Sequence, residues 1–265
     1  MSMTMTTPVE IPYPPVAVPH LRITAAACVL HIHPGSAEPW VQASYQDPSG
    51  RIPLDISQDA DGAHITVPKE LADLFRYFDG LPRLDLVLGT ARPFTLSIET
   101  GASENQFELG GLPLTRLALN HGAGKVILGF STPNPTRMSM LKLSVGAAAL
   151  EGRGLANASA SEMVVEGGAA GVQLDFDGML SCDCRVRIAT ALAGVELSIP
   201  AAVAAEITSS SFLGGAEADA GFTRRGDAYC TRAAMDGKTP LLTIRNESAL
   251  GGLRLRTPSS PVLAG

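Results

Sequence analysis

Two pairs of potential metal ligands stand out in the sequence. One residue separates His31 from His33, and one residue separates Cys182 from Cys184. Residues two apart on a strand face the same side, so either pair could give two ligands to a zinc ion. Neither pair has the further ligands that zinc needs, because no third ligand is evident near the histidines, His20 being a distant possibility, and no C-x-x-C motif occurs. We therefore predict no metal site, an exposed polar strand face for the histidines, and buried thiols for the cysteines.

Motifs for covalent catalysis and for phosphate binding are incomplete. Ser210 or Ser211 in TSSSF could act as a nucleophile with a histidine, but no G-x-S-x-G elbow is present. The segment NHGAGK, residues 120–125, looks like a phosphate loop at first sight. Such a loop needs G-x-x-x-x-G-K-[ST] before a helix, whereas Val126 follows the lysine and a strand pattern follows Val126. We predict no catalytic residue, no cofactor and no enzymatic activity.

The same small-residue segment recurs along the chain, which gives NHGAGK a structural meaning. Comparable segments are TAAACV, SVGAAA, EGGAAG and ATALAG. The apolar residues that flank the segment are seven positions apart in five units: Ile23 and Leu30, Leu119 and Val126, Leu143 and Leu150, Val165 and Val172, Ile188 and Val195. Two further units, Ile98 with Phe107 and Ile244 with Leu253, follow the same pattern stretched to nine.

These units repeat at a nearly constant interval. Steps of 21, 24, 22 and 23 residues separate, in order, Ile98, Leu119, Leu143, Val165 and Ile188. Within each arm apolar and polar residues alternate, which is typical of strands with one face in a core. A period near 22 residues indicates a repeat architecture. The sequence therefore predicts an all-β fold, an irregular single-chain β-solenoid with coils of about 22 residues.

Stacked coils explain why the corner residues are small. Strands stack about 4.8 Å apart, so bulky side chains would collide where one corner lies over another. Glycine also permits backbone angles that other residues avoid. We predict that four glycines form one structural row of corners: Gly101, Gly122, Gly146 and Gly168.

The remaining chain is organised around these coils. Residues 68–80, PKELADLFRYFDG, place apolar residues at helical spacing and predict one short helix. We predict three segments: a flexible Pro-rich lead over 1–18, a single β domain over 19–256, and a loose tail over 257–265. The β domain divides into N-terminal strands and the short helix over 19–82 and solenoid coils over 83–256.

Composition narrows the partners and the compartment. The net charge is -6, and the 20 basic residues are scattered, which argues against nucleic acid. No secretory signal and no apolar run long enough for a spanning helix is visible. The four cysteines of such a long chain fit a reducing compartment better than a disulfide framework. We expect a soluble, cytoplasmic protein that reaches a membrane only through a partner.

At this point the repeats resemble a known bacterial family. Units such as LALNHGAGKVIL, LKLSVGAAALEG, VVEGGAAGVQLDF and VRIATALAGVELSIP are similar to the toastrack-type domains known as putative adhesins. These domains are related to the C-terminal domain of cell-wall-active antibiotic response proteins. The resemblance covers residues 83–256 best and implies a non-enzymatic stacked-β protein linked to envelope stress. Bactofilins, which are polymerising β-solenoids, are the nearest alternative.

Two classes of function follow. The first is a non-catalytic scaffold or interaction protein, whose partner is another protein, a second copy of the chain or an envelope component. The second is an enzyme or binding protein that acts on an extended polymer such as a glycan. That second class needs a row of charged residues at equivalent outward positions of adjacent coils. Ile127, Gln173 and Glu196 occupy such positions and form no charged row, which favours the scaffold.

Overall fold

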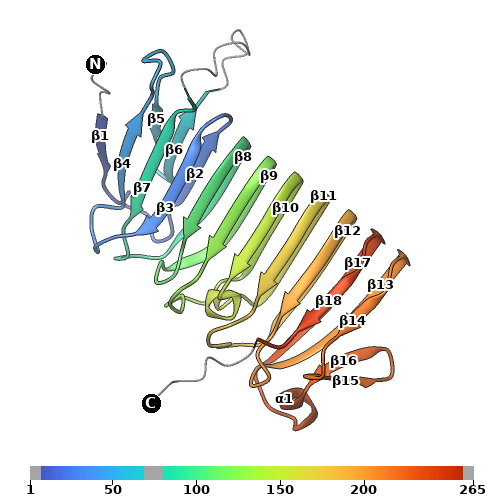
Figure 1. Cartoon of the computed structure of the whole chain (residues 1–265). Helices are drawn as coiled ribbons and strands as arrows, with labels where there is room; N and C mark the ends of the chain where they lie inside the picture. Colours follow the sequence, from blue (N-terminus) through green and yellow to red (C-terminus); the bar gives the residue numbers. More distant parts are fainter. Residues whose placement is uncertain (1–6, 69–79, 259–265) are drawn as a thin grey trace, which may run out of the picture.

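The fold consists mainly of long bent strands. The structure is a computed structural model, which describes residues 7–68 and 80–258. Each strand runs through a first arm, bends at a corner of small residues, and continues as a second arm. The five central strands are β8 (Phe94–Glu108), β9 (Leu114–Gly129), β10 (Met140–Arg153), β11 (Glu162–Asp175) and β12 (Cys184–Ser198). They pair in parallel, each with the next, and Figure 1 shows them side by side.

The strand register confirms the predicted solenoid. Ile98 pairs with Leu119, Leu119 with Leu143, Leu143 with Val165, and Val165 with Ile188. The intervals read from the sequence are therefore the intervals between stacked coils. Loops complete each coil, because they connect the end of one second arm to the start of the next first arm.

The two stretched units were interpreted wrongly. Asn105 in β8 lies opposite Val126, and Asn246 lies opposite Ile188. Both units therefore have the usual offset of seven, with a buried asparagine in the slot that other coils fill with an apolar residue. The count of nine arose because an apolar residue two positions away was taken instead, Phe107 after Asn105 and Ile244 before Asn246. Asn105 is held by hydrogen bonds, because its Oδ1 accepts from the Leu30 backbone N–H at 2.9 Å.

Two more coils precede β8, and their order in the stack differs from their order in the chain. The inner coil joins β2 (His20–Ala25) to β3 (Val29–Pro34), and both strands pair with β8. The outer coil joins β6 (Gly62–Val67) to β7 (Arg83–Leu88), which pair with β2 and β3. Three antiparallel strands cover this end: β4 (Val41–Gln46) on β7, β5 (Asp55–Gln58) on β6, and β1 (Thr7–Ile11) on β4.

The C-terminal end shows the same inversion of order. The last coil of the chain, β17 (Leu241–Leu250) with β18 (Leu253–Arg256), lies directly against β12. The earlier coil, β13 (Ala204–Leu213) with β14 (Ala216–Ala218), lies outside it. A hairpin of β15 (Phe222–Arg225) and β16 (Ala228–Thr231) attaches to β13.

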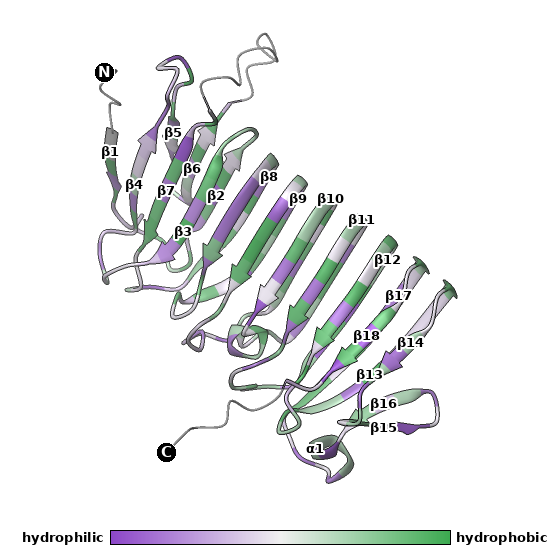
Figure 2. Cartoon of the chain, viewed as in Figure 1, coloured by the Kyte–Doolittle hydropathy of each residue, from purple (hydrophilic) through white to green (hydrophobic). Residues whose placement is uncertain are grey.

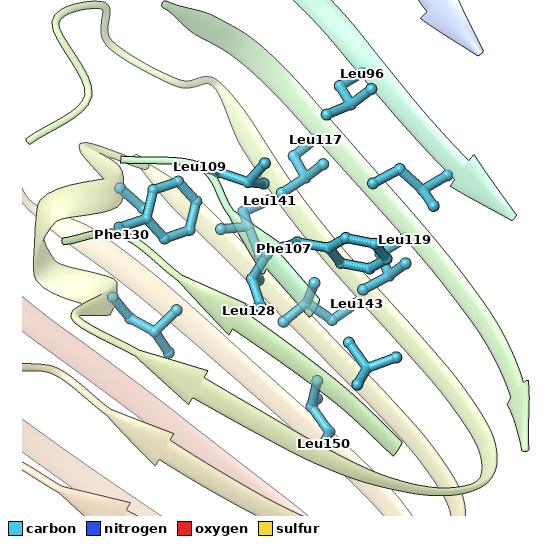
Figure 3. Packing of buried hydrophobic residues seen from close by; sticks show 14 of the residues in the cluster. Leu96, Phe107, Leu109, Leu117, Leu119, Leu128, Phe130, Leu141, Leu143 and Leu150 are labelled. Atoms are coloured by element: carbon cyan, nitrogen blue, oxygen red, sulfur yellow. The ribbon is translucent and has the colours of Figure 1, made fainter. Parts of the chain in front are cut away.

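The core lies between the two arms of the stacked coils. Figure 2 shows hydrophobic and hydrophilic residues alternating along the strands, as the sequence predicts. Leu96, Leu117 and Leu141 occupy one register position on β8, β9 and β10, and all three are buried. Phe107 and Leu128 face them from the second arms (Figure 3). Burial of such rows is the main stabilising contribution in a fold with few aromatic residues.

Helices contribute little to the described chain. The helix predicted over 68–80 falls almost entirely outside the described residues. Those residues contain a short α-helix, α1 (Arg232–Met235), and a 3-10 turn, η3 (Leu155–Ala158), neither of which was predicted. Thr231 caps α1, because its side chain accepts a hydrogen bond from the Ala234 N–H. Within residues 7–68 and 80–258, no helix has the length and apolar character that crossing a bilayer requires.

Candidate functional site

The two histidines of the H-x-H motif lie on β3 with unequal surroundings. His31 Nδ1 is 3.2 Å from Asp85 Oδ1 and 3.0 Å from Arg83 Nη2. Arg83 also forms an ion pair with Asp85, with Nε and Oδ2 2.8 Å apart. His33 is exposed, and His20 contacts Ser97 on another part of the stack. In the part of the chain that the structure describes, no three His, Cys, Asp or Glu side chains gather to hold a metal.

The cysteines are separate thiols. Cys28, Cys184 and Cys230 are buried, and Cys182 is partly buried. Burial raises the pKa of Cys28 to about 12, and burial raises that of Cys184 to about 12 as well. These two side chains are therefore protonated near neutral pH and are poor nucleophiles and metal ligands.

The serines of TSSSF have no histidine beside them. All five histidines lie on β2, β3, β6 and β9, whereas Ser210 and Ser211 lie on β13. Four strands separate β9 from β13, which amounts to about 24 Å at the usual spacing between strands. The stack therefore keeps these groups apart rather than assembling a catalytic pair.

The four corner glycines occupy equivalent positions on successive strands. A Cβ atom at Gly101 would lie 2.0 Å from the Ala26 carbonyl oxygen, and one at Gly146 would lie 2.5 Å from that of Gly122. At Gly122 and Gly168 the corresponding distances are 2.9 and 3.0 Å, again to the carbonyl oxygen of the neighbouring corner. Backbone atoms cannot move aside as a flexible side chain can. The row therefore has a steric reason and needs no ligand.

The outer face of the second arms carries a row of residues that is more polar than the three positions chosen from the sequence indicated. Ile127, Gln173 and Glu196 do share one register position. The structure adds Glu151 between the first two, and Arg254 and Glu217 beyond Glu196. Arg254 compensates part of this negative charge, because it lies 3.9 Å from Glu196 and 3.7 Å from Glu217.

A groove of about 620 Å³ runs beside this row with a floor of small residues. Its floor consists of Ala149, Gly171, Gly194, Gly252 and Gly215, in register across five coils. No atom lies within 4 Å of where a Cβ would stand at Gly171, Gly194 or Gly215. Unlike the corner glycines, these three are not required by close neighbours.

Large apolar side chains gather at one place on the surface of the described chain. Seven large apolar side chains are exposed over the described residues as a whole, and four of them lie at the corner of the last three coils: Leu192, Leu250, Phe212 and Leu213. Leu192, Leu250 and Leu213 are in register with one another. We name these four residues the corner ridge. The bends of β17 and β13 are correspondingly green in Figure 2.

The preceding coils show how unusual this ridge is. Ala102, Ala123, Ala147 and Ala169 hold the same register position on β8 to β11. The change from alanine to leucine begins at Leu192, within the segment ATALAG. An alignment of the corner segments could have revealed it, because Leu192 is the one large residue of ATALAG, a segment otherwise made of small residues.

The corner ridge adjoins an open edge of the sheet. β16 pairs with β13 only over Glu206–Thr208. From Ser209 onward no described strand pairs with the outer side of β13, and none pairs with the outer side of β14. The site can therefore offer apolar contact and unpaired backbone groups, which suits binding of another chain and not covalent chemistry.

Comparisons with known proteins agree with the fold. A profile of the N-terminal domain of toast_rack, DUF2154, matches residues 16–151. No curated protein matches the chain in sequence. Among solved structures, a putative cell adhesion protein from Clostridium sporogenes ATCC 15579 is 14% identical, with a TM-score of 0.51. That alignment covers 97% of this chain and 100% of the other, so the two proteins share their fold along nearly all of the chain.

Two further solved structures align over most of the chain at lower similarity. A putative adhesin from Bacteroides fragilis NCTC 9343 is 6% identical with a TM-score of 0.41, and covers 96% of this chain and 98% of its own. A putative lipid binding protein from Parabacteroides distasonis ATCC 8503 is 8% identical with a TM-score of 0.41, and covers 96% of each chain. Similarity at this level adds nothing to the assignment of function.

Proposed function

This chain belongs to the family of the toast_rack N-terminal domain, and we propose that it is a non-catalytic scaffold that binds another protein at its C-terminal corner. The observation that carries the proposal is the corner ridge. Exposed apolar side chains that form a contiguous patch are typical of interaction surfaces, whereas singly scattered ones are normal. The ridge stands on a continuous stack of paired strands, which holds its residues in fixed register.

An adhesion role is a finer form of the same proposal. The name of the Clostridium structure supports it, and an adhesion protein needs a surface that contacts another macromolecule. A link to envelope stress and a cytoplasmic location remain parts of the proposal, for which cell fractionation of the tagged full chain is the direct test. The polymer-binding alternative and the bactofilin-like alternative stay predictions.

Site-directed photocrosslinking in bacterial cells tests the binding surface. The full chain would carry benzoylphenylalanine either at Leu192, on the ridge, or at Met179, which is exposed elsewhere. We expect a discrete crosslinked product from position 192 and none from position 179, with the crosslinked peptide identified by mass spectrometry.

A second substitution makes the result specific. Leu250→Ser should abolish the product formed at position 192, because Leu250 is the register neighbour of Leu192. Arg185→Ser, on an exposed site of the same strand β12, is the matched control and should leave the product intact. Equal products from both positions, or a product that survives Leu250→Ser, would overturn the proposal.

A further inference from the structure

The two ends of the stack are protected to different degrees. At the N-terminal end, β5 covers four residues of β6, and β4 covers all six residues of β7. At the C-terminal end, β16 pairs with three residues of β13, and from Ser209 onward no described strand pairs with the outer side of the coil. The Tyr229 hydroxyl donates a hydrogen bond to the Ala216 carbonyl of β14, at 3.4 Å. Uncovered strand edges are templates for pairing, and natural proteins usually protect them. Short strands thus form the outer edge at the N-terminal end, whereas most of a long bent coil forms it at the C-terminal end.

The residues of this edge lack the usual protection. Open edges are commonly guarded by lysine, proline or inward-facing charge. The uncovered segment reads SSSFLGGAEA over residues 209–218, with no lysine and no proline. Phe212 is 87% exposed and Leu213 is 62% exposed. Apolar side chains on an unguarded edge favour association with another strand.

Three rows of outward residues end at this edge. Leu192, Leu250 and Leu213 form the first row; Gly194, Gly252 and Gly215 the second; Glu196, Arg254 and Glu217 the third. A strand added beside β13 and β14 would extend each row by one residue. To continue the three rows, the added strand needs an apolar side chain beside Leu213, a small one beside Gly215, and one of complementary charge beside Glu217.

The charge balance of the third row determines which charge is expected on the residue of the added strand that lies beside Glu217. Among the residues that the structure describes, Arg254 is the one cation paired with the carboxylates of Glu196 and Glu217, at 3.9 and 3.7 Å. The Glu217 side chain is 79% exposed and belongs to β14, whose outer side has no described partner strand. One cation for two carboxylates leaves a negative charge at the edge. A lysine or arginine on the added strand would compensate it.

We infer that the C-terminal edge accepts an extended strand of a partner protein, parallel to β13 and β14, with the pattern apolar–X–small–X–basic. This inference rests on the proposed function and specifies its binding mode. The chain itself shows that the pattern fits, because Leu250, Gly252 and Arg254 present it to the inner side of β13 and β14. Backbone hydrogen bonds would supply affinity, and the three rows would supply register.

A synthetic peptide with the sequence of residues 245–256, RNESALGGLRLR, is a suitable probe. Hydrogen exchange of the full chain with saturating peptide should show new protection within residues 209–218. Residues 55–58 of β5, an edge strand at the other end, serve as the internal control and should not change. No protection of 209–218, or protection of both edges alike, would overturn the inference.

Charge exchange tests the third row. A peptide with glutamate in place of the arginine aligned with Arg254 should bind the wild-type chain up to about fivefold more weakly, the size expected for an exposed ion pair. Glu217→Lys should reverse that preference. Glu162→Lys, an exposed change on β11, is the matched control and should preserve it. An unchanged preference in Glu217→Lys would contradict the predicted register.

Two results separate this inference from the proposed function. If the peptide fails to bind while crosslinking at Leu192 still depends on Leu250, the binding surface stands and strand addition is wrong. Sedimentation of the chain without peptide tests whether a second copy of the chain occupies the edge instead. A dimer that protects residues 209–218 without peptide would show that a second copy fills the edge, and would overturn the assignment to a partner protein.

Discussion

Gly146 in β10 lies directly over Gly122 in β9, so closely that a Cβ atom at position 146 would stand 2.5 Å from the Gly122 carbonyl oxygen. Gly171 in β11 offers a contrast within the same stack, because a Cβ there would meet no atom within 4 Å. Both glycines lie within a long strand of the stack, and they differ in how close the neighbouring atoms are to the Cβ position. This difference gives the corner a direct test.

We predict opposite effects of alanine at these two positions. Gly146→Ala should lower the free energy of unfolding by about 1–3 kcal/mol, because the corner backbone must shift to admit the methyl group. Gly171→Ala should leave it unchanged or raise it by up to about 1 kcal/mol, since alanine restricts the unfolded chain. Urea denaturation measures both. Equal losses in the two variants would contradict the steric account of the corner.

The buried asparagines should also differ in their effects on stability. Asn105→Leu removes the acceptor for the Leu30 backbone N–H and should cost about 1–3 kcal/mol. Asn246→Leu should cost less or stabilise, because Oδ1 of Asn246 has no hydrogen-bond partner among the described residues. Its only described side-chain hydrogen bond is from Nδ2 to Ser209 Oγ, at 3.1 Å. Thermal melting of both variants would compare them, and a larger loss at Asn246 would refute this ranking.

Asp219 should make stability depend on acidity. Burial raises the pKa of this carboxyl, but hydrogen bonds from the backbone N–H groups of Thr257 and Gly221 and from the Thr257 hydroxyl outweigh it and lower the pKa overall. A lowered folded pKa gives stability that is present above the unfolded value, about 3.9, and is lost as pH falls through the folded value.

The matched variant for this prediction is Asp219→Asn. It should melt below wild type at pH 7, and the difference should shrink as the pH is lowered below about 4. Melting curves at a series of pH values would measure the difference. A constant difference across the series would show that the charge of Asp219 contributes nothing.

Thiol reactivity should separate Cys182 from the other cysteines. Burial raises the pKa of Cys28 and Cys184 to about 12, so few thiolates form there at pH 8. Cys182 is the only cysteine that is not fully buried. Alkylation of the native chain followed by peptide mapping should label Cys182 first, and all four after unfolding. Rapid labelling of Cys184 in the native chain would show that the start of β12 opens readily.

The repeat was predictable from sequence because it is local. Alternation within each arm and the interval from Leu119 to Leu143 can be counted along the chain, and the stacked register follows the same count. The slots of Asn105 and Asn246 were misread because hydropathy was the only guide to register. A buried amide that forms hydrogen bonds can occupy an apolar position, and only its neighbours reveal this.

The ends of the stack and the corner ridge could not be read in the same way. The alternation in β13 resembles that in β17, so nothing local indicates which of them lies against β12. Exposure of Leu192 depends on the absence of a covering element, which is a property of the whole fold. The edge at Ser209 is likewise visible only when the partners of every neighbouring strand are known.

During translation, β13 and β14 leave the ribosome before the strands that join them to the stack. Because β17 and β18 lie between β12 and that outer coil, the coil has no strand of the stack to pair with until β17 and β18 are made. A chain that stops before Leu241 would lose an internal layer and leave both β12 and β13 without their neighbours. The corner ridge is complete only when Leu250 joins it, so only a finished chain can present it.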